Sequence, residues 1–76
     1  MGDTGVVLFD TTTSAMQAEA VLRRDGLPVR LIPTPRELSS DCGVALRFSW
    51  SDHERIETML RDAAVVVAGV HQLPAR

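Results

Sequence analysis

Residues 44–63 read VALRFSWSDHERIETMLRDA and contain two hydrophobic periods, one after the other. In residues 44–50, apolar side chains alternate with small or polar ones, which predicts a half-buried β-strand. In residues 56–63, they recur at the spacing of an amphipathic helix. Ser51 and Glu54 match a capping box, so we expect the helix to begin at Ser51. The stretch therefore predicts a strand that leads directly into a helix.

A second strand and helix precede this stretch. Residues 5–9 form an apolar run without alternation, which is typical of a strand buried on both faces. Ser14 and Gln17 match the same capping box before an apolar stripe at helical spacing, so we expect a helix from Ser14. Gly26 suits the left-handed turn that ends many helices. The chain thus predicts two units of strand and helix.

Two further strands complete the predicted fold. Residues 29–32 and residues 65–70 are rich in β-branched and apolar side chains, and residues 71–76 form a polar tail. The order βαββαβ predicts a single ferredoxin-like domain of the α+β class over residues 1–76. Both helices should cover one face of a four-stranded antiparallel sheet. We expect the other face to be covered too, which makes it the natural surface for a homodimer.

Composition excludes several classes of function. The formal net charge is −2, whereas nucleic-acid-binding domains normally carry a basic surplus, so we expect no nucleic acid partner. All eight basic residues are arginine, which excludes lysine-based covalent catalysis. The longest apolar run, residues 63–70, is far shorter than a membrane span, and the N-terminus does not resemble a secretory signal. We therefore expect a cytoplasmic protein without membrane contact.

Cysteine and histidine are too few for a structural metal site. One cysteine and two histidines cannot complete a zinc site within the chain, and we expect neither metal nor cofactor. The cysteine, Cys42, lies in residues 34–43, a connection that is long for a simple hairpin. It shares its parity with Val44 and Leu46, so an early start of the strand would bury it as a small hydrophobic residue. The alternative is a reactive thiol, and the residue pattern leaves both interpretations open.

Residues 33–48 read PTPRELSSDCGVALRF. They resemble the pattern P-x-P-R-E-(L/I)-S-S-x-C-G-x-A-L-R-F of a family of small bacterial proteins described as selenium/sulfur carrier-like, formerly a domain of unknown function. The resemblance extends over most of the chain, including Ala-Glu-Ala at residues 18–20 and Leu-Pro-Val-Arg at residues 27–30. It implies that Cys42 holds a persulfide or selenopersulfide, and that the partners are proteins that donate and accept sulfur or selenium.

A carrier of this kind needs a thiolate that can attack a donor persulfide. Positive charge, hydroxyl groups and backbone N–H groups near Cys42 would favour the thiolate, whereas carboxylates would oppose it. Each change of one pKa unit corresponds to about 1.4 kcal/mol, so one carboxylate can cancel the effect of one arginine. The residues that we expect to act at this site are Arg36, Glu37, Ser39, Ser40, Gly43 and Arg47.

A second interpretation needs no reactive cysteine. It is a non-catalytic ferredoxin-like module that dimerises through the sheet face without helices and binds a small anion or a protein partner through Arg36 and Arg47. The parity of Arg47 predicts that its side chain lies on that face. The sequence has no carboxylate pair at a defined spacing, no Gly-rich phosphate loop and no Ser-His-Asp arrangement. We therefore expect a stoichiometric carrier or a binding module rather than an enzyme.

Overall fold

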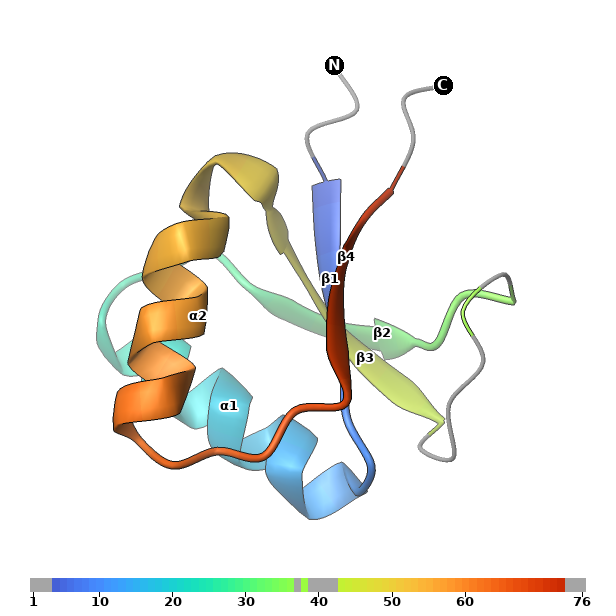
Figure 1. Ribbon diagram of the computed structural model, residues 1–76, viewed down its shortest axis with the longest axis horizontal. Helices are drawn as coiled ribbons and strands as arrows, with labels where there is room; N and C mark the ends of the chain where they lie inside the picture. Colours follow the sequence, from blue (N-terminus) through green and yellow to red (C-terminus); the bar gives the residue numbers. More distant parts are fainter. Residues whose placement is uncertain (1–3, 37, 39–42, 74–76) are drawn as a thin grey trace.

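The computed structural model describes residues 4–36, 38 and 43–73, which form two helices and a four-stranded sheet (Figure 1). The predicted α+β class and ferredoxin-like order are confirmed. Along the chain, the elements are β1 (Thr4–Leu8), α1 (Thr12–Arg24), β2 (Arg30–Pro33), β3 (Val44–Ser49), a 3₁₀ turn η1 (Trp50–Asp52), α2 (His53–Asp62) and β4 (Gly69–Gln72).

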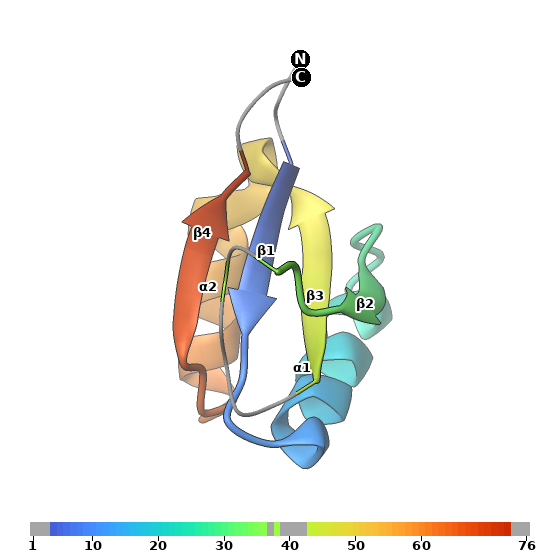
Figure 2. The same cartoon turned by 90° about the vertical axis from the view of Figure 1, so that its right-hand side faces the viewer.

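The sheet is antiparallel throughout, with the strand order β2-β3-β1-β4. The first strand in the chain therefore lies in the interior of the sheet, between β3 and β4. Both helices pack against the same face, as predicted (Figure 2). We call the opposite face, on which Val6, Leu8 and Ala45 lie, the helix-free face.

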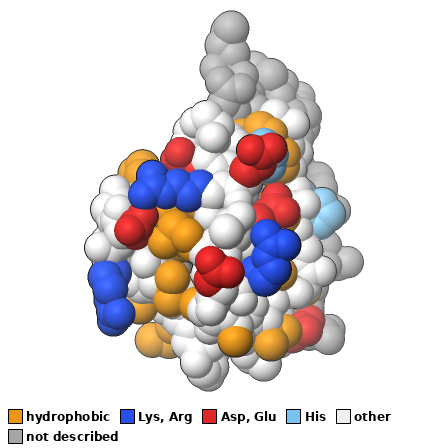
Figure 3. All heavy atoms as spheres, turned by 60° about the vertical axis from the view of Figure 1, so that its left-hand side comes forward, with side chains coloured by type: hydrophobic (Ala, Val, Ile, Leu, Met, Phe, Trp, Pro, Cys, Tyr) orange, Lys and Arg blue, Asp and Glu red, His pale blue; other side chains and the backbone are white. Residues whose placement is uncertain are grey.

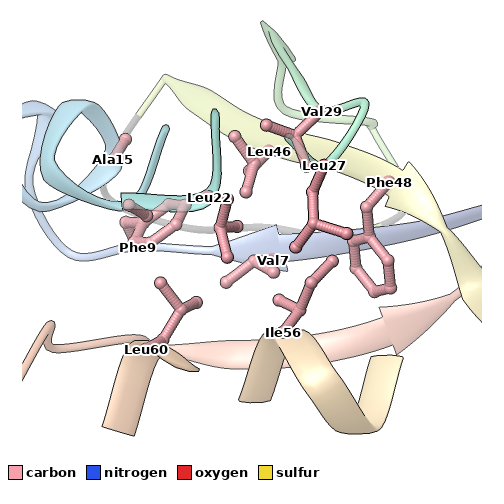
Figure 4. Packing of buried hydrophobic residues seen from close by; sticks show 11 residues of the cluster. Val7, Phe9, Ala15, Leu22, Leu27, Val29, Leu46, Phe48, Ile56 and Leu60 are labelled. Carbon is pink, nitrogen blue, oxygen red and sulfur yellow. The ribbon is translucent and has the colours of Figure 1, made fainter. Parts of the chain in front are cut away.

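The main core lies between the sheet and the two helices (Figure 4). Val7 of β1 and Leu46 of β3 meet Leu22 of α1 and Ile56 and Leu60 of α2, and all five are buried. Burying an apolar side chain of this size contributes about 1.5–3 kcal/mol, so this cluster is the main source of stability. The other buried members of the cluster are Phe9, Ala15, Ala18, Leu27, Val29 and Phe48.

The start of α1 differs from the prediction. Thr11, not Ser14, is the N-cap, because Thr11 has an extended backbone and its Oγ1 accepts a hydrogen bond from the Ser14 N–H at 3.1 Å. Ser14 lies within the first turn of α1, so the predicted capping box of Ser14 and Gln17 is wrong. The helix end is confirmed, since Gly26 has a φ of +82°. Glycine adopts this left-handed conformation readily because it has no Cβ atom, and many helices end on such a residue.

The start of α2 also differs. The chain winds through η1 before α2 begins at His53, and the N-cap Asp52 makes no side-chain capping bond. The indole of Trp50 stacks on the His53 ring at 4.3 Å, and His53 Nδ1 donates to the Trp50 carbonyl at 2.8 Å. These contacts close the first turn without a capping box, so the prediction of a helix start at Ser51 is wrong. Ala63, expected in the apolar stripe, is exposed beyond the end of α2.

The last strand lies further along the chain than predicted. Residues 65–70 were expected to form it, but β4 is Gly69–Gln72, and His71 belongs to the strand rather than to a tail. Ala64 has a φ of +58°, which turns the chain away from α2 and leaves Val66 61% exposed. The Ala68 N–H then donates to the Leu8 carbonyl at 2.7 Å, where pairing with β1 starts. Residues 65–68 are thus a connection, although their composition favours a strand.

Candidate functional site

The predicted site falls largely on the connection between β2 and β3. Among its residues, Arg36, Gly43 and Arg47 are described by the structure. Those that lie outside the described residues are Glu37, Ser39, Ser40 and Cys42.

The two ends of this connection are held together. β2 and β3 pair as far as Pro33 and Val44, and the Thr34 N–H donates to the Gly43 carbonyl at 3.2 Å, one step further out. Gly43 is exposed, and a Cβ atom built on it would meet no heavy atom of the other described residues within 4 Å, its chain neighbours aside. The residue that follows Cys42 in the chain is therefore at the surface of the part of the molecule that the structure describes.

The connection also packs on the sheet. The Leu38 N–H donates to the Pro35 carbonyl at 3.0 Å, and the half-buried Leu38 side chain packs against the cluster of Val6, Leu8 and Ala45. Figure 2 shows the segment after β2 passing in front of β3 towards β1, on the helix-free face. The expected cover of this face thus comes in part from the chain itself. Dimerisation through the remainder stays a prediction.

Arg47 lies on the helix-free face, as its parity predicted. Its neighbour in the register of β1 is Val6, which belongs to the cluster on that face, and its side chain is exposed. Along β3, however, Arg47 lies four residues beyond Gly43, roughly 13 Å away at the usual rise of a strand. Arg36 is exposed on the connection itself. An effect of either arginine on Cys42 stays a prediction.

The structure adds a hollow that the sequence analysis missed. It measures about 490 Å³ and lies where the chain that enters β2 diverges from β3. Arg30 and Arg23 line it together with Arg47. The described residues that line it are Thr4, Arg23, Pro28, Val29, Arg30, Arg47, Phe48 and Ser49.

The sequence feature that could have indicated this hollow is an arginine on each of two neighbouring strands, Arg30 and Arg47, with both side chains on the same face of the sheet. They become direct partners only once the register of β2 and β3 is known. A long connection does not fix that register, whereas a two-residue turn would have done so. The sequence alone therefore does not show that Arg30 and Arg47 are partners.

No metal or membrane site is found in the part of the chain that the structure describes. In residues 4–36, 38 and 43–73, no three histidine, cysteine, aspartate or glutamate side chains are grouped so that they could hold a metal ion. Within the same residues, no helix has the length and apolarity to cross a membrane.

The comparison with protein families gives a match over most of the chain. A search of curated proteins and a search of solved structures found no match. The family described as "Putative Se/S carrier protein-like" matches residues 4–72, which include every helix and strand and the entire connection that contains Cys42. Because the match covers nearly the whole chain, the protein belongs to the Se/S carrier-like family.

Proposed function

We propose that the protein carries sulfur or selenium on Cys42, as a persulfide or selenopersulfide, between a donor protein and an acceptor protein. The observation that carries this proposal is the family match over residues 4–72, which includes the only cysteine of the chain. A compartment that keeps thiols reduced, such as the cytoplasm, suits this function, because the free thiol must be available between transfers.

The chemistry requires two displacement steps and no external oxidant. The Cys42 thiolate attacks the outer sulfur of a donor persulfide, forming the new S–S bond while the donor's own S–S bond breaks and the donor thiolate leaves. A nucleophile on the acceptor then attacks the outer sulfur, and Cys42 leaves as a thiolate. For selenium, the bond that forms and breaks is S–Se. The protein is regenerated, so it acts as a stoichiometric carrier.

The described neighbourhood is compatible with access to such a thiol. Gly43 is exposed, and among the described residues only its chain neighbours lie close to the position of a side chain there, so a partner can approach the chain at the position after Cys42. Arg36 is exposed on the same connection as Cys42. We propose that Arg36 favours the thiolate, with Ser39 and Ser40 as hydrogen-bond donors and Glu37 as an opposing charge. Arg47 is the second cation expected to favour it.

The first test is the rate of Cys42 alkylation as a function of pH, in native and in denatured protein. We expect rapid alkylation of the native protein, with a midpoint well below about 8.5, the ordinary pKa of a cysteine thiol. Arg36→Gln should move the midpoint upwards, whereas Arg61→Gln, which removes a charge on α2, should not. A native thiol that reacts only after unfolding would contradict the proposal.

The second test is the transfer itself. Wild-type protein incubated with a cysteine desulfurase and labelled cysteine should gain one sulfur atom by mass, and a reductant should remove it. Cys42→Ser should gain none. An enzyme that releases selenium from selenocysteine provides the matching experiment for the other element. Equal labelling of wild type and Cys42→Ser would refute a role for this residue as the carrier.

A further inference from the structure

We infer that the hollow beside β2 binds a doubly charged tetrahedral oxyanion between the guanidinium groups of Arg30 and Arg47. Phosphate and sulfate represent the class, either free or as the end group of a small organic molecule. This inference goes beyond the carrier function proposed for Cys42 and does not depend on it.

The two arginines lie side by side on neighbouring strands, on the same face of the sheet. Arg30 of β2 and Arg47 of β3 are direct partners in the antiparallel register, and they form the last pair before the strands diverge. Side chains in such positions have Cβ atoms about 4.5–5.5 Å apart, and like charges placed there destabilise the sheet. Both side chains are exposed, and within the described residues neither forms an ion pair. An anion bound between them would turn this repulsion into two attractions.

The other described residues that line the hollow supply donors and no carboxylate. Thr4 and Ser49 are direct partners in the register of β1 and β3, and both line the hollow. Their hydroxyl groups can donate to an oxyanion, while each guanidinium offers N–H groups in a planar fork that suits two oxygen atoms at once. Phe48 contributes apolar surface to the lining. None of the described lining residues is acidic.

A third arginine, Arg23, lines the hollow but already has partners within the protein. Arg23 Nε lies 3.5 Å from Glu19 Oε2, and Arg23 Nη2 donates to the Val29 carbonyl at 3.4 Å. Its charge is thus partly matched within α1, and it contributes mainly by adding to the positive potential. Arg30 and Arg47 remain as the two cations available to a ligand.

The charge of this hollow differs from that of the helix side of the molecule. Seen from the helices, acidic and basic side chains are interspersed over the surface (Figure 3). The chain as a whole carries a formal net charge of −2, so a group of three arginines is not a consequence of its composition. Two opposed guanidinium forks select a ligand with several oxygen atoms and two charges over a halide ion.

The inference can be tested by titrating ¹⁵N-labelled protein with sodium phosphate, with sodium sulfate and with sodium chloride at matched ionic strength. We expect the amide signals of Arg30, Arg47 and Ser49 to shift and saturate with phosphate and sulfate, but not with chloride. Glycerol phosphate is compared with inorganic phosphate, and tighter binding of the ester would identify an organic ligand. Equal or weaker binding of the ester would identify the free ion.

Variants separate this site from general charge effects. Arg30→Gln and Arg47→Gln should each weaken phosphate binding roughly tenfold or more, as expected for loss of a charge-assisted hydrogen bond. Each should also raise the unfolding temperature in the absence of anion, because the repulsion between the two charges is removed. Arg47→Lys keeps the charge but loses the fork, so binding should still weaken. Arg61→Gln removes the same charge from α2 and should leave binding unchanged.

Two outcomes would overturn the inference. One is a response to phosphate no larger than the response to chloride. The other is wild-type affinity in both Arg30→Gln and Arg47→Gln. Cys42→Ser should bind phosphate as the wild type does, so failure of the carrier proposal and failure of this one give different results.

Discussion

Gly5 allows two aromatic rings to lie directly against β1. Its partner in the register is Phe48, and a Cβ atom added to Gly5 would overlap Phe48 Cζ and come within 2.7 Å of Trp50 Cε3. Phe48 and Trp50 are themselves stacked, with ring centroids 5.9 Å apart. Glycine is required here because the rings occupy the space of a side chain, not because the backbone needs an unusual conformation.

Gly5→Ala is therefore expected to reduce the free energy of unfolding by about 1–3 kcal/mol, the usual cost of overpacking a core. Gly43→Ala is the matched control, because a Cβ atom at Gly43 meets none of the other described residues within 4 Å, its chain neighbours aside. Urea denaturation of both variants measures the difference. Similar unfolding midpoints for the two variants would show that the rings can move aside.

At the scale of the elements, the hydroxyl of Thr11 determines where α1 begins. Thr11→Ala should lower the free energy of unfolding by about 0.5–2 kcal/mol, because the Ser14 N–H loses its acceptor. Ser14→Ala keeps that N–H and should cost less. Thermal unfolding followed by circular dichroism compares the two. A larger loss for Ser14→Ala would favour the start of the helix that the sequence suggested.

The order of the elements was predictable because hydrophobic periods of two and 3.6 residues distinguish strands from helices over several residues. The ends of the helices and strands were not predictable, because each end depends on a single contact. α2 begins after the stack of Trp50 on His53, and β4 begins where Ala68 reaches Leu8. The run at residues 65–68 favours a strand by composition, but the turn at Ala64 makes it a connection.

In the candidate site, too, the features that depend on alternation along a strand were predictable, and those that depend on a single contact were not. The parity of Arg47 was enough to predict its face, because successive side chains of a strand alternate. Its pairing with Arg30 required the register, which the long connection leaves open. Cys42 was singled out by its sequence context, which no periodic pattern explains. Its role is tested by the rate of its alkylation and by the transfer of labelled sulfur to it.

For the whole molecule, the connection between β2 and β3 is part of the folded structure through Leu38. Leu38→Ala should lower the free energy of unfolding by about 1–2 kcal/mol. This is less than for a fully buried leucine, because Leu38 is only half-buried where it packs on the helix-free face. Hydrogen exchange of the β1 amides should accelerate as well. Val66→Ala is the control, since Val66 is 61% exposed and its loss should cost little. Equal effects of the two variants would mean that Leu38 adds nothing to the sheet.

The stack of Trp50 on His53 also gives the protein an intrinsic optical probe. The chain has one tryptophan and no tyrosine, so its near-ultraviolet fluorescence comes almost entirely from Trp50. The indole lies between Phe48 at the end of β3 and His53 at the start of α2, and separation of those elements would change its emission. Fluorescence therefore reports the docking of α2 on the sheet. Comparing it with the circular dichroism of both helices tests whether the domain unfolds in one step.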